Sequence, residues 1–499
     1  MGKERNGDKM MQMERDNLLM DFYELTMAQS NFDPKSKNEI VYFDAFFRNL
    51  PLESGYAIMA GGEEIIDYIK HLHFSAEDIA YLRSLNKFTE EFLNELAAFR
   101  FTGDLYMVPD GTPVFGHEPI LTVKARAIEA MFLETALLTY MNRGIKYATA
   151  AKQITLAAGD IPVMEFGARR GDNPDCASKY AYMAGCSGTS NTKVGKQYGI
   201  PVLGTMAHSM VMNEESEYVA FKKFAKAYPD DSVFLVDTID TLHSGIPNAV
   251  RVANDYLIPT GHRLKGIRID SGDLAYLSKQ ARKMLDSVGM TDAKICLSNG
   301  LTAKTIIALK NQGACMDSIG AGDNISAPKE RVGVVYKLAA TTKHNELVPK
   351  IKVSNDIAKV TNPGYKKVYR IYDRKTGKAM GDLVALHDEI IPTDQLELID
   401  IENEWNRKQV TNYEAKELQV PIFKDGNLVY QEPSLEEKRV YCDDQMGTLY
   451  DEVKRLDNPD KYYVDVTKKL LNLKKELILA SKTQMVIKEV DQVKQLVLK

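Results

Sequence analysis

The residues best placed to do chemistry lie just after a short predicted strand near the middle of the chain. Residues 201–203 form the strand signal, residues 204–207 follow it, and His208 and Ser209 come where the strand gives way to a helix. Enzymes built on parallel sheets keep their catalytic groups at the carboxyl ends of the strands. His208 is therefore a candidate catalytic residue, although a single histidine is more often a hydrogen-bonded structural residue.

Two other predicted strands end in groups suited to anions. Residues 161–166 are followed by Arg169 and Arg170, and a guanidinium binds carboxylate or phosphate through paired hydrogen bonds. The segment 187–192, after a short strand predicted at 184–186, combines hydroxyls and backbone amides that suit a small polar ligand. Each pattern also has a structural explanation, because exposed arginine pairs are commonly solvated and a helix N-cap needs only one such residue.

Acids and glycines follow the later strands. The strand predicted at residues 266–269 is followed by Asp270 and Asp273, which can hold ribose hydroxyls or a magnesium-bound pyrophosphate, although Asp270 or Ser271 alone would serve as a helix cap. Residues 298–300 are small and polar, and residues 319–324 form a glycine-rich turn able to wrap amides around a phosphate. Together these residues favour an enzyme acting on a phosphorylated, sugar-containing substrate with a carboxylate or aromatic co-substrate.

Strands and helices alternate regularly through this part of the chain, which is typical of a parallel sheet. About eight strands at this spacing favour a (β/α) barrel over an open sheet. The predicted strands are residues 161–166, 184–186, 201–203, 233–236, 266–269, 294–297, 317–319 and 334–338.

Different patterns flank the predicted barrel. Residues 1–124 mix antiparallel strands and helices, as in a small α+β domain, and residues 125–353 form the barrel domain. Residues 354–499 lose the alternation and form a third, α+β region. Hairpins are predicted there at 369–386 and 420–430, and a helix at 435–456 with Ser434 as its N-cap.

Composition narrows the class of protein. A chain of 499 residues exceeds the size of one hydrophobic core, so we expect two or three domains. The net charge of -5 means that the chain has no excess of basic residues, which argues against nucleic acid as a partner. Five cysteines without a CxxC pair argue against structural zinc and disulfides and fit a reducing cytosol. No apolar run is long enough to span a bilayer and the first residues do not resemble a secretory signal, so we expect a cytoplasmic protein with no membrane partner.

Six motifs, in order along the chain, resemble the nicotinate phosphoribosyltransferase family. They cover residues 23–27, 165–170, 188–191, 204–209, 268–273 and 320–323. The resemblance extends over roughly residues 15 to 350, and residues beyond 353 also look like the bacterial form. It implies the fold of type II phosphoribosyltransferases, an incomplete α/β barrel beside an α+β open-faced sandwich that the C-terminal region partly completes. It also implies a homodimer with a composite active site, in which the N-terminal helix can pack on the partner subunit.

The reaction implied by the resemblance joins nicotinate to 5-phosphoribosyl 1-pyrophosphate, giving nicotinate mononucleotide and pyrophosphate in the salvage route to NAD. ATP hydrolysis would be coupled to it through a phosphohistidine at His208. An imidazole attacks the γ-phosphorus of ATP only when it is neutral, and an unperturbed histidine, with a pKa near ~6.5, is mostly neutral in the cytosol. Mg²⁺ is expected mainly on the substrate phosphates, so no set of protein metal ligands and no zinc site is predicted.

The resemblance also assigns roles to individual residues. Phe166 and, from the partner subunit, Tyr23 would stack on the pyridine ring. Asp270 would act as a catalytic acid group near the ribose, where a carboxylate stabilises positive charge as the glycosidic bond breaks. The remaining substrate-binding residues are Arg169, Ser190, Thr205 and Arg268 around the carboxylate and pyrophosphate, Asp273 at the ribose and magnesium, and Gly320, Gly322 and Asp323 at the 5-phosphate.

Ser190 bears on the choice of substrate. The similar nicotinamide-using enzymes look like Gly-Thr-Asp where this chain has Gly188, Thr189 and Ser190, and an acid there would repel a carboxylate substrate. We therefore favour nicotinate. The alternatives are a phosphoribosyltransferase that uses nicotinamide or quinolinate, although the quinolinate enzymes are much shorter, and a non-catalytic phosphosugar-binding barrel in which His208 is structural.

Overall fold

The computed structural model describes residues 17–32, 38–354, 359–401 and 403–497. It divides into two compact units. The barrel unit comprises Lys146–Arg331 and Ser434–Asp443, and the sandwich unit comprises Met1–Ile145, Val332–Pro433 and Asp444–Lys499. The divisions fall within two helices, α7 (Glu134–Ala158) and α16 (Leu435–Thr448).

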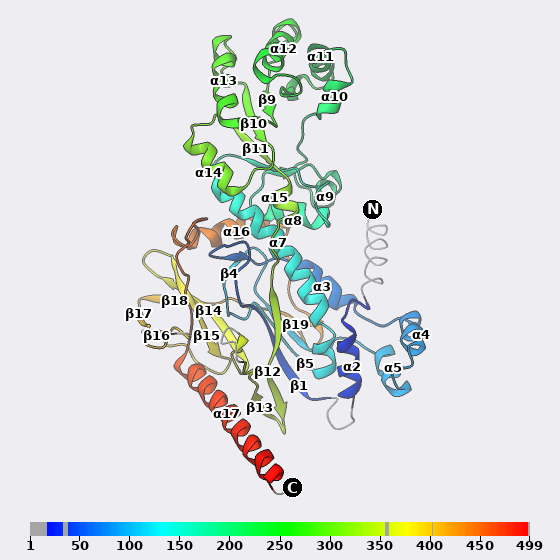
Figure 1. Ribbon diagram of the computed structural model, residues 1–499, viewed down its shortest axis with the longest axis vertical. Helices are drawn as coiled ribbons and strands as arrows, with labels where there is room; N and C mark the ends of the chain where they lie inside the picture. The colour runs from blue at the N-terminus through cyan, green and yellow to red at the C-terminus, as the bar shows by residue number, and fades with distance from the viewer. Residues whose placement is uncertain (1–16, 33–37, 355–358, 402, 498–499) are drawn as a thin grey trace. The chain divides into compact units, whose positions relative to one another are not determined.

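A parallel sheet of six strands forms the barrel unit, in the order β7-β6-β11-β10-β9-β8. Figure 1 labels its strands β9, β10 and β11. The strands are β6 (Val163–Glu165), β7 (Gly188–Thr189), β8 (Val233–Leu235), β9 (Gly266–Ile269), β10 (Lys294–Ser298) and β11 (Ser318–Ala321). The edge strands β7 and β8 do not pair with each other. The prediction of an incomplete barrel is therefore confirmed.

Helices connect these strands and cover the sheet with apolar side chains. They are α8 (Pro174–Met183), α9 (Thr192–Tyr198), α10 (His208–Met212), α11 (Glu217–Ala227), α12 (Ile246–Val252), α13 (Leu274–Ser287), α14 (Ala303–Asn311) and α15 (Asp323–Ser326). Ile267, Ile269, Ile295 and Leu297 are fully buried in neighbouring strands, as expected for parallel strands covered on both faces.

Three of the eight predicted strands differ from the observed elements. Residues 184–186 lie just after α8, and the strand itself is β7. Residues 201–203 make only a single bridge, between Val202 and Thr189, because Pro201 has no amide hydrogen to donate. The strand expected at 334–338 belongs to β12 (Val334–Lys343), which pairs antiparallel with β1 (Ile40–Phe47) in the sandwich unit.

The first sheet of the sandwich unit has seven strands in the order β13-β12-β1-β5-β3-β19-β20. Besides β1 and β12, they are β3 (Asp104–Met107), β5 (Leu121–Arg126), β13 (Glu346–Pro349), β19 (Val420–Lys424) and β20 (Asn427–Leu428). The C-terminal segment thus adds β19 and β20 to a sheet that N-terminal residues begin. The helices α2 (Phe22–Ser30), α3 (Gly62–His71), α4 (Ala76–Ser84), α5 (Glu90–Ala97) and α6 (Ala127–Met131), and the pair β2 (Ala57–Ile58) and β4 (Pro113–Val114), complete the N-terminal part.

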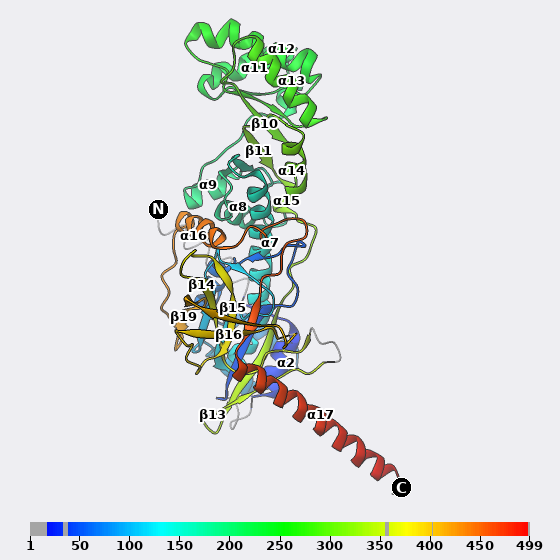
Figure 2. The same cartoon turned by 90° about the vertical axis from the view of Figure 1, so that its left-hand side faces the viewer.

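A second sheet of six strands, in the order β17-β16-β21-β15-β14-β18, is built entirely from C-terminal residues. Its members are β14 (Lys366–Asp373), β15 (Ala379–Leu386), β16 (Gln395–Ile399), β17 (Arg407–Thr411), β18 (Tyr413–Glu417) and β21 (Val464–Val466). The hairpin predicted within 369–386 is β14–β15. Helix α17 (Lys468–Val497) ends the described chain and is drawn in red in Figure 2.

Capping residues start α16, which ends eight residues earlier than predicted. Ser434 accepts a hydrogen bond from the Glu437 amide, and the Glu437 carboxylate accepts from Ser434 in return, so the predicted N-cap is confirmed. Within the barrel unit, Glu436 accepts a hydrogen bond of 2.6 Å from Tyr182 on α8.

In the described part of the chain, none of the helices is both long and apolar enough to span a bilayer.

A buried ion pair joins the second sheet to the N-terminal part of the sandwich unit. Arg370 on β14 donates two hydrogen bonds, of 2.9 and 2.7 Å, to Asp382 on β15 and a third, of 2.8 Å, to the carbonyl of Pro113 on β4. Both charged side chains are fully buried. Burial and the Asp382 charge raise the pKa of Glu118, which lies beside this pair. A charge removed from such a cluster leaves its partners uncompensated.

We therefore expect Arg370→Ala to lower the free energy of unfolding by about 3–5 kcal/mol, as measured by urea or thermal unfolding. Arg83→Ala is the matched control, because Arg83 makes the same two-bond contact with Glu90 but both side chains are about half exposed, and such pairs contribute little. Equal effects of the two substitutions would contradict the argument from burial.

Candidate active site

Residues from five of the six strands, three of them with polar side chains, lie at the carboxyl edge of the barrel sheet. The register pairs Cys296 with Arg268 and Ser298 with Gly320, so groups that are far apart in the chain become neighbours. Phe166 follows β6, Asp237 follows β8, Asp270 follows β9, and Ser298 and Gly320 lie at the ends of β10 and β11. This edge is the candidate active site.

Arg268 is the central cation of the site. Its guanidinium donates hydrogen bonds of 2.8 Å to Ser298 Oγ and 2.9 Å to Asp270 Oδ1, and a longer one of 3.4 Å to Thr205 Oγ1. Ser298 Oγ in turn donates to Asp270. The guanidinium carbon lies 5.4 Å from the centre of the Phe166 ring, within the range of a cation–π contact. The predicted residues Arg268, Asp270, Thr205 and Phe166 are thus brought together.

Asp237 links the two predicted catalytic residues, His208 and Asp270. Its Oδ2 accepts hydrogen bonds from the Asp270 amide, at 3.1 Å, and from Ser271 Oγ, at 2.6 Å. Its Oδ1 lies 3.9 Å from His208 Nε2 and has no hydrogen-bond partner among the described residues. The Asp237 side chain is 1% exposed, whereas that of His208, the first residue of α10, is 35% exposed.

The strand patterns did not single out Asp237. The signal that could have found it is an acid two residues beyond a buried strand, in Val236-Asp237-Thr238. Leu235 pairs with Arg268 in the sheet, so continuing that register brings Asp237 opposite Asp270, the residue that directly follows β9. Because β8 and β9 are neighbours and parallel, acids at equivalent positions lie side by side.

The site has room for the Phe166 ring only because residue 320 is glycine. A Cβ atom at Gly320 would lie 2.6 Å from two carbons of that ring and 3.1 Å from the Ser298 Cβ, closer than packed carbons approach. Gly167 has the same restriction against Ser326. Gly320 therefore permits close packing of the aromatic ring and Gly167 permits close packing against Ser326, in addition to the backbone approach expected for a phosphate loop.

The arginine pair and the glycine-rich turn lie together. Arg170 Nε is 3.1 Å from Asp323 Oδ1 in a half-exposed ion pair, which joins the loop after β6 to the start of α15. Arg169 is exposed and makes no hydrogen bond or ion pair with other described residues. Gly322 precedes α15 and its carbonyl accepts from the Ile325 and Ser326 amides.

Two predicted ligand-binding residues have different surroundings. Ser190 follows β7, where its amide donates 2.8 Å to the Glu165 carbonyl, and no described residue bonds its hydroxyl. Asp273 is the N-cap of α13 and accepts a 3.0 Å bond from the Tyr276 amide. The residue of this loop that caps a helix is therefore Asp273, and not Asp270 as the structural alternative supposed.

Tyr23 lies in the sandwich unit, on α2, and is 44% exposed. Phe22 and Met27 of the same helix are also largely exposed. An exposed aromatic surface of this kind is typical of a surface that meets a partner.

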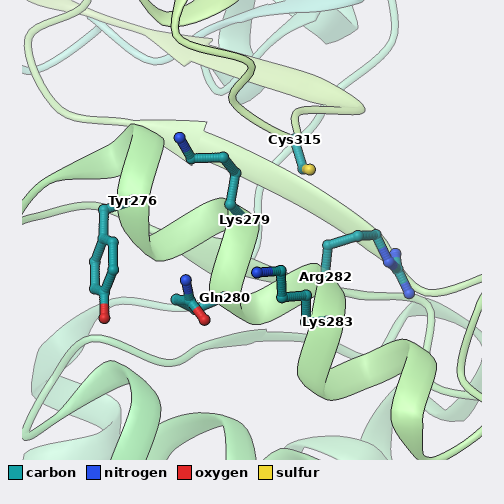
Figure 3. A pocket seen from close by; sticks show the side chains of 6 residues that line it. All are labelled: Tyr276, Lys279, Gln280, Arg282, Lys283 and Cys315. Carbon is teal, nitrogen blue, oxygen red and sulfur yellow. The ribbon is translucent and has the colours of Figure 1, made fainter.

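A separate hollow of about 370 Å³ is lined by side chains of α13 and by Cys315 (Figure 3). None of its lining side chains belongs to the predicted site. Two of its three cations already have partners, since Lys279 donates to the Gln312 carbonyl and Arg282 to the carbonyls of Met290 and Ala293. The lining residues are Tyr276, Lys279, Gln280, Arg282, Lys283 and Cys315.

Family models match most of the chain in three consecutive pieces. The nicotinate phosphoribosyltransferase N-terminal domain matches residues 18–142, the family's core model matches residues 161–376, and its C-terminal domain matches residues 365–474. The C-terminal match includes the second sheet of the sandwich unit.

Curated relatives and solved structures agree with these models. The chain is 41% identical to nicotinate phosphoribosyltransferase of Bacillus subtilis, over 90% of this chain and 92% of the relative. It is 35% identical to the Mycobacterium tuberculosis protein pncB2 of the same name, over 89% and 90%. The crystal structure of human nicotinic acid phosphoribosyltransferase superposes with a TM-score of 0.79 at 25% identity, covering 92% of this chain and all of that one. The chain therefore belongs to the nicotinate phosphoribosyltransferase family.

Proposed function

We propose that this protein joins nicotinate to 5-phosphoribosyl 1-pyrophosphate, producing nicotinate mononucleotide and pyrophosphate. The observation that carries the proposal is the pairing of Arg268 with Phe166 at the sheet edge. A flat apolar ring beside a guanidinium matches an aromatic carboxylate, since one partner stacks on the ring and the other binds the charged group. The names of the curated relatives support the same substrate.

In the proposed reaction the nicotinate ring nitrogen attacks C1 of the ribose. Its lone pair forms the new N–C bond while the C–O bond to pyrophosphate breaks, and the leaving oxygen keeps that electron pair. Positive charge develops on the ribose during the exchange, and the carboxylates of Asp270 and Asp237 would stabilise it. Arg169 and Arg170 would bind anionic parts of the substrates, and the residues from Gly320 to Asp323 would receive the 5-phosphate.

Magnesium and ATP belong to the proposal. Among the described residues no three acids gather into a metal-binding cluster, so Mg²⁺ would be held mainly by the substrate phosphates, with Asp237 Oδ1, which has no hydrogen-bond partner among described residues, as an oxygen of the kind that Mg²⁺ prefers. When bound, the ion would neutralise charge on the pyrophosphate. For ATP, a nitrogen of His208 would form the N–P bond to the γ-phosphorus as the P–O bond to ADP breaks. The Asp237 carboxylate beside His208 would balance the positive charge that this leaves on the imidazole.

We also propose a homodimer in which Tyr23 of one subunit reaches the barrel site of the other. The support is the exposed aromatic surface of α2. Tyr23 and Phe166 would then enclose the pyridine ring from opposite faces. The cytosolic location expected from composition stays a prediction.

The test of the reaction uses nicotinate and 5-phosphoribosyl 1-pyrophosphate with and without magnesium ATP, measuring pyrophosphate and nicotinate mononucleotide. We expect wild type to make product and ATP to stimulate it, and His208→Ala to lose the stimulation. Turnover of nicotinamide alone would mean that the substrate is assigned wrongly. Ligand binding by both proteins without any product would favour the non-catalytic alternative.

The close approach of Gly320 to Phe166 generates a second prediction. Gly320→Ala should push the ring from its place, since overpacking of this kind costs about 1–3 kcal/mol, and raise the KM for nicotinate about tenfold or more. Gly333→Ala is the control, because a Cβ there meets no atom within 4 Å. Unchanged nicotinate kinetics in Gly320→Ala would remove Phe166 from the proposed substrate site.

Substrate choice can be tested at Ser190. Ser190→Asp should weaken nicotinate at least about tenfold, because two carboxylates repel strongly at a partly desolvated site, while nicotinamide should bind better than it does to wild type. Ser190→Ala controls for loss of the hydroxyl. Competition assays with the two pyridines measure the ratio, and equal losses for both would contradict the role given to residue 190.

A further inference from the structure

Ser298 lies at the carboxyl end of β10, on the same face of the barrel sheet as Arg268 and Asp270. Leu297 pairs with Ile269 in the sheet, so continuing this register brings Ser298 beside Asp270. Successive side chains of a strand point to opposite faces, and Arg268, two residues before Asp270, therefore shares that face. Ser298 is 2% exposed. The sheet thus places a buried hydroxyl between two groups of opposite charge.

The hydroxyl oxygen of Ser298 joins these two charged groups. It accepts a 2.8 Å hydrogen bond from Arg268 Nε and donates one to Asp270 Oδ1. Arg268 Nη2 donates 2.9 Å to the same Oδ1, so the three side chains form a closed ring of hydrogen bonds. A guanidinium has no acceptor and an ionised carboxylate has no donor, whereas a hydroxyl offers both at one oxygen. An alanine at residue 298 would leave the Nε donor without its acceptor.

This ring of hydrogen bonds determines which edge of the Arg268 guanidinium is open to a ligand. The side-on edge, formed by Nε and Nη2, is occupied by Ser298 and Asp270. The end-on edge is formed by Nη1 and the second hydrogen of Nη2. Nη1 makes only a 3.4 Å hydrogen bond, to Thr205 Oγ1, which is longer than a normal N–H···O bond. The end-on edge therefore has the donors that are least used by other described residues.

We propose that Ser298 is a positioning residue, which holds Arg268 by its side-on edge so that the carboxylate of nicotinate binds to the end-on edge. The ligand then shares the guanidinium with Ser298 and Asp270. The inference rests on the proposed function, because it requires that Arg268 binds the nicotinate carboxylate. A carboxylate accepts two parallel hydrogen bonds from such an edge, whereas a carboxamide presents one acceptor oxygen and no charge. Ser298 thereby contributes to the preference for nicotinate.

The test measures KM and kcat separately in the intact protein. We expect Ser298→Ala to raise the KM for nicotinate about two- to tenfold, the change that corresponds to the net contribution of one hydrogen bond. The KM for 5-phosphoribosyl 1-pyrophosphate and kcat should change less, because Asp270 keeps its bonds to Arg268 and to Asp237. In competition assays nicotinate should lose part of its advantage over nicotinamide.

Ser278→Ala is the matched control. Ser278 is a fully buried serine of α13 in the same unit, and its hydroxyl also both donates and accepts. It donates 3.2 Å to the Ala275 carbonyl and accepts 3.1 Å from the Cys315 amide, outside the candidate active site. Both substitutions should lower the melting temperature, but only Ser298→Ala should change the KM for nicotinate. A fall in melting temperature of Ser298→Ala without that change in KM would mark a purely structural residue and overturn the proposal.

Arg268→Ala separates this inference from the function on which it rests. An unchanged KM for nicotinate in Arg268→Ala would remove Arg268 from the substrate site and contradict the proposed function as well. A large effect of Arg268→Ala with none of Ser298→Ala would overturn the positioning role alone. Because Ser298 acts through Arg268, the double variant should bind nicotinate no worse than Arg268→Ala. A further rise in KM in the double variant would mean that Ser298 acts by another route.

Discussion

The buried carboxylate of Glu165 organises the loops of the barrel unit. One oxygen accepts hydrogen bonds from Ser178 on α8, at 2.8 Å, and from Thr189 on β7, at 2.5 Å. The other accepts from the Gly167 amide and from Ser326 on α15. A carboxylate without water is stable only when it is paired or hydrogen-bonded in this way. These bonds join four segments of the chain at one point, so the loops that bear Phe166, Ser190 and Asp323 share a common anchor.

Charge pairing within the candidate active site has a consequence for binding. Arg268 is already bonded to Asp270 and Ser298, so a carboxylate or phosphate that uses this guanidinium has to share or displace those partners. Charged hydrogen bonds held in place beforehand cost little reorganisation when the ligand arrives. Arg268 is therefore already held beside its counter-charge, with the Phe166 ring 5.4 Å from its guanidinium carbon.

Local patterns predicted much of this arrangement. Short apolar runs followed by polar loops marked β6, β9 and β11, because a parallel strand buried on both faces reads as a continuous apolar segment. The assignment of residues 334–338 to the barrel was wrong because strand-like composition does not reveal the partner. The first four residues of β12 alternate between buried and partly buried positions, and the strand forms an antiparallel ladder with β1.

Contacts between distant residues were beyond such patterns. Arg370 and Asp382 read as ordinary charges in a hairpin, and only the fold shows that both are buried. The buried Glu24 accepts a hydrogen bond from the Thr135 amide, 111 residues away along the chain, and nothing in the local sequence around Glu24 marks that contact. Hydrogen bonds of this kind depend on how helices pack, and amino-acid type alone does not specify them.

Burial separates the charges that build this protein from those available to a ligand. Arg370 and Asp382 are fully buried and bonded to other residues, whereas Arg268 and Asp270 are 15% and 30% exposed and can exchange partners. Asp237 has both properties. Its Oδ2 accepts hydrogen bonds from the Asp270 amide and the Ser271 hydroxyl, and its Oδ1 lies 3.9 Å from Nε2 of the more exposed His208. A buried carboxylate with one oxygen not yet hydrogen-bonded is suited to stabilise a positive charge on a neighbouring imidazole.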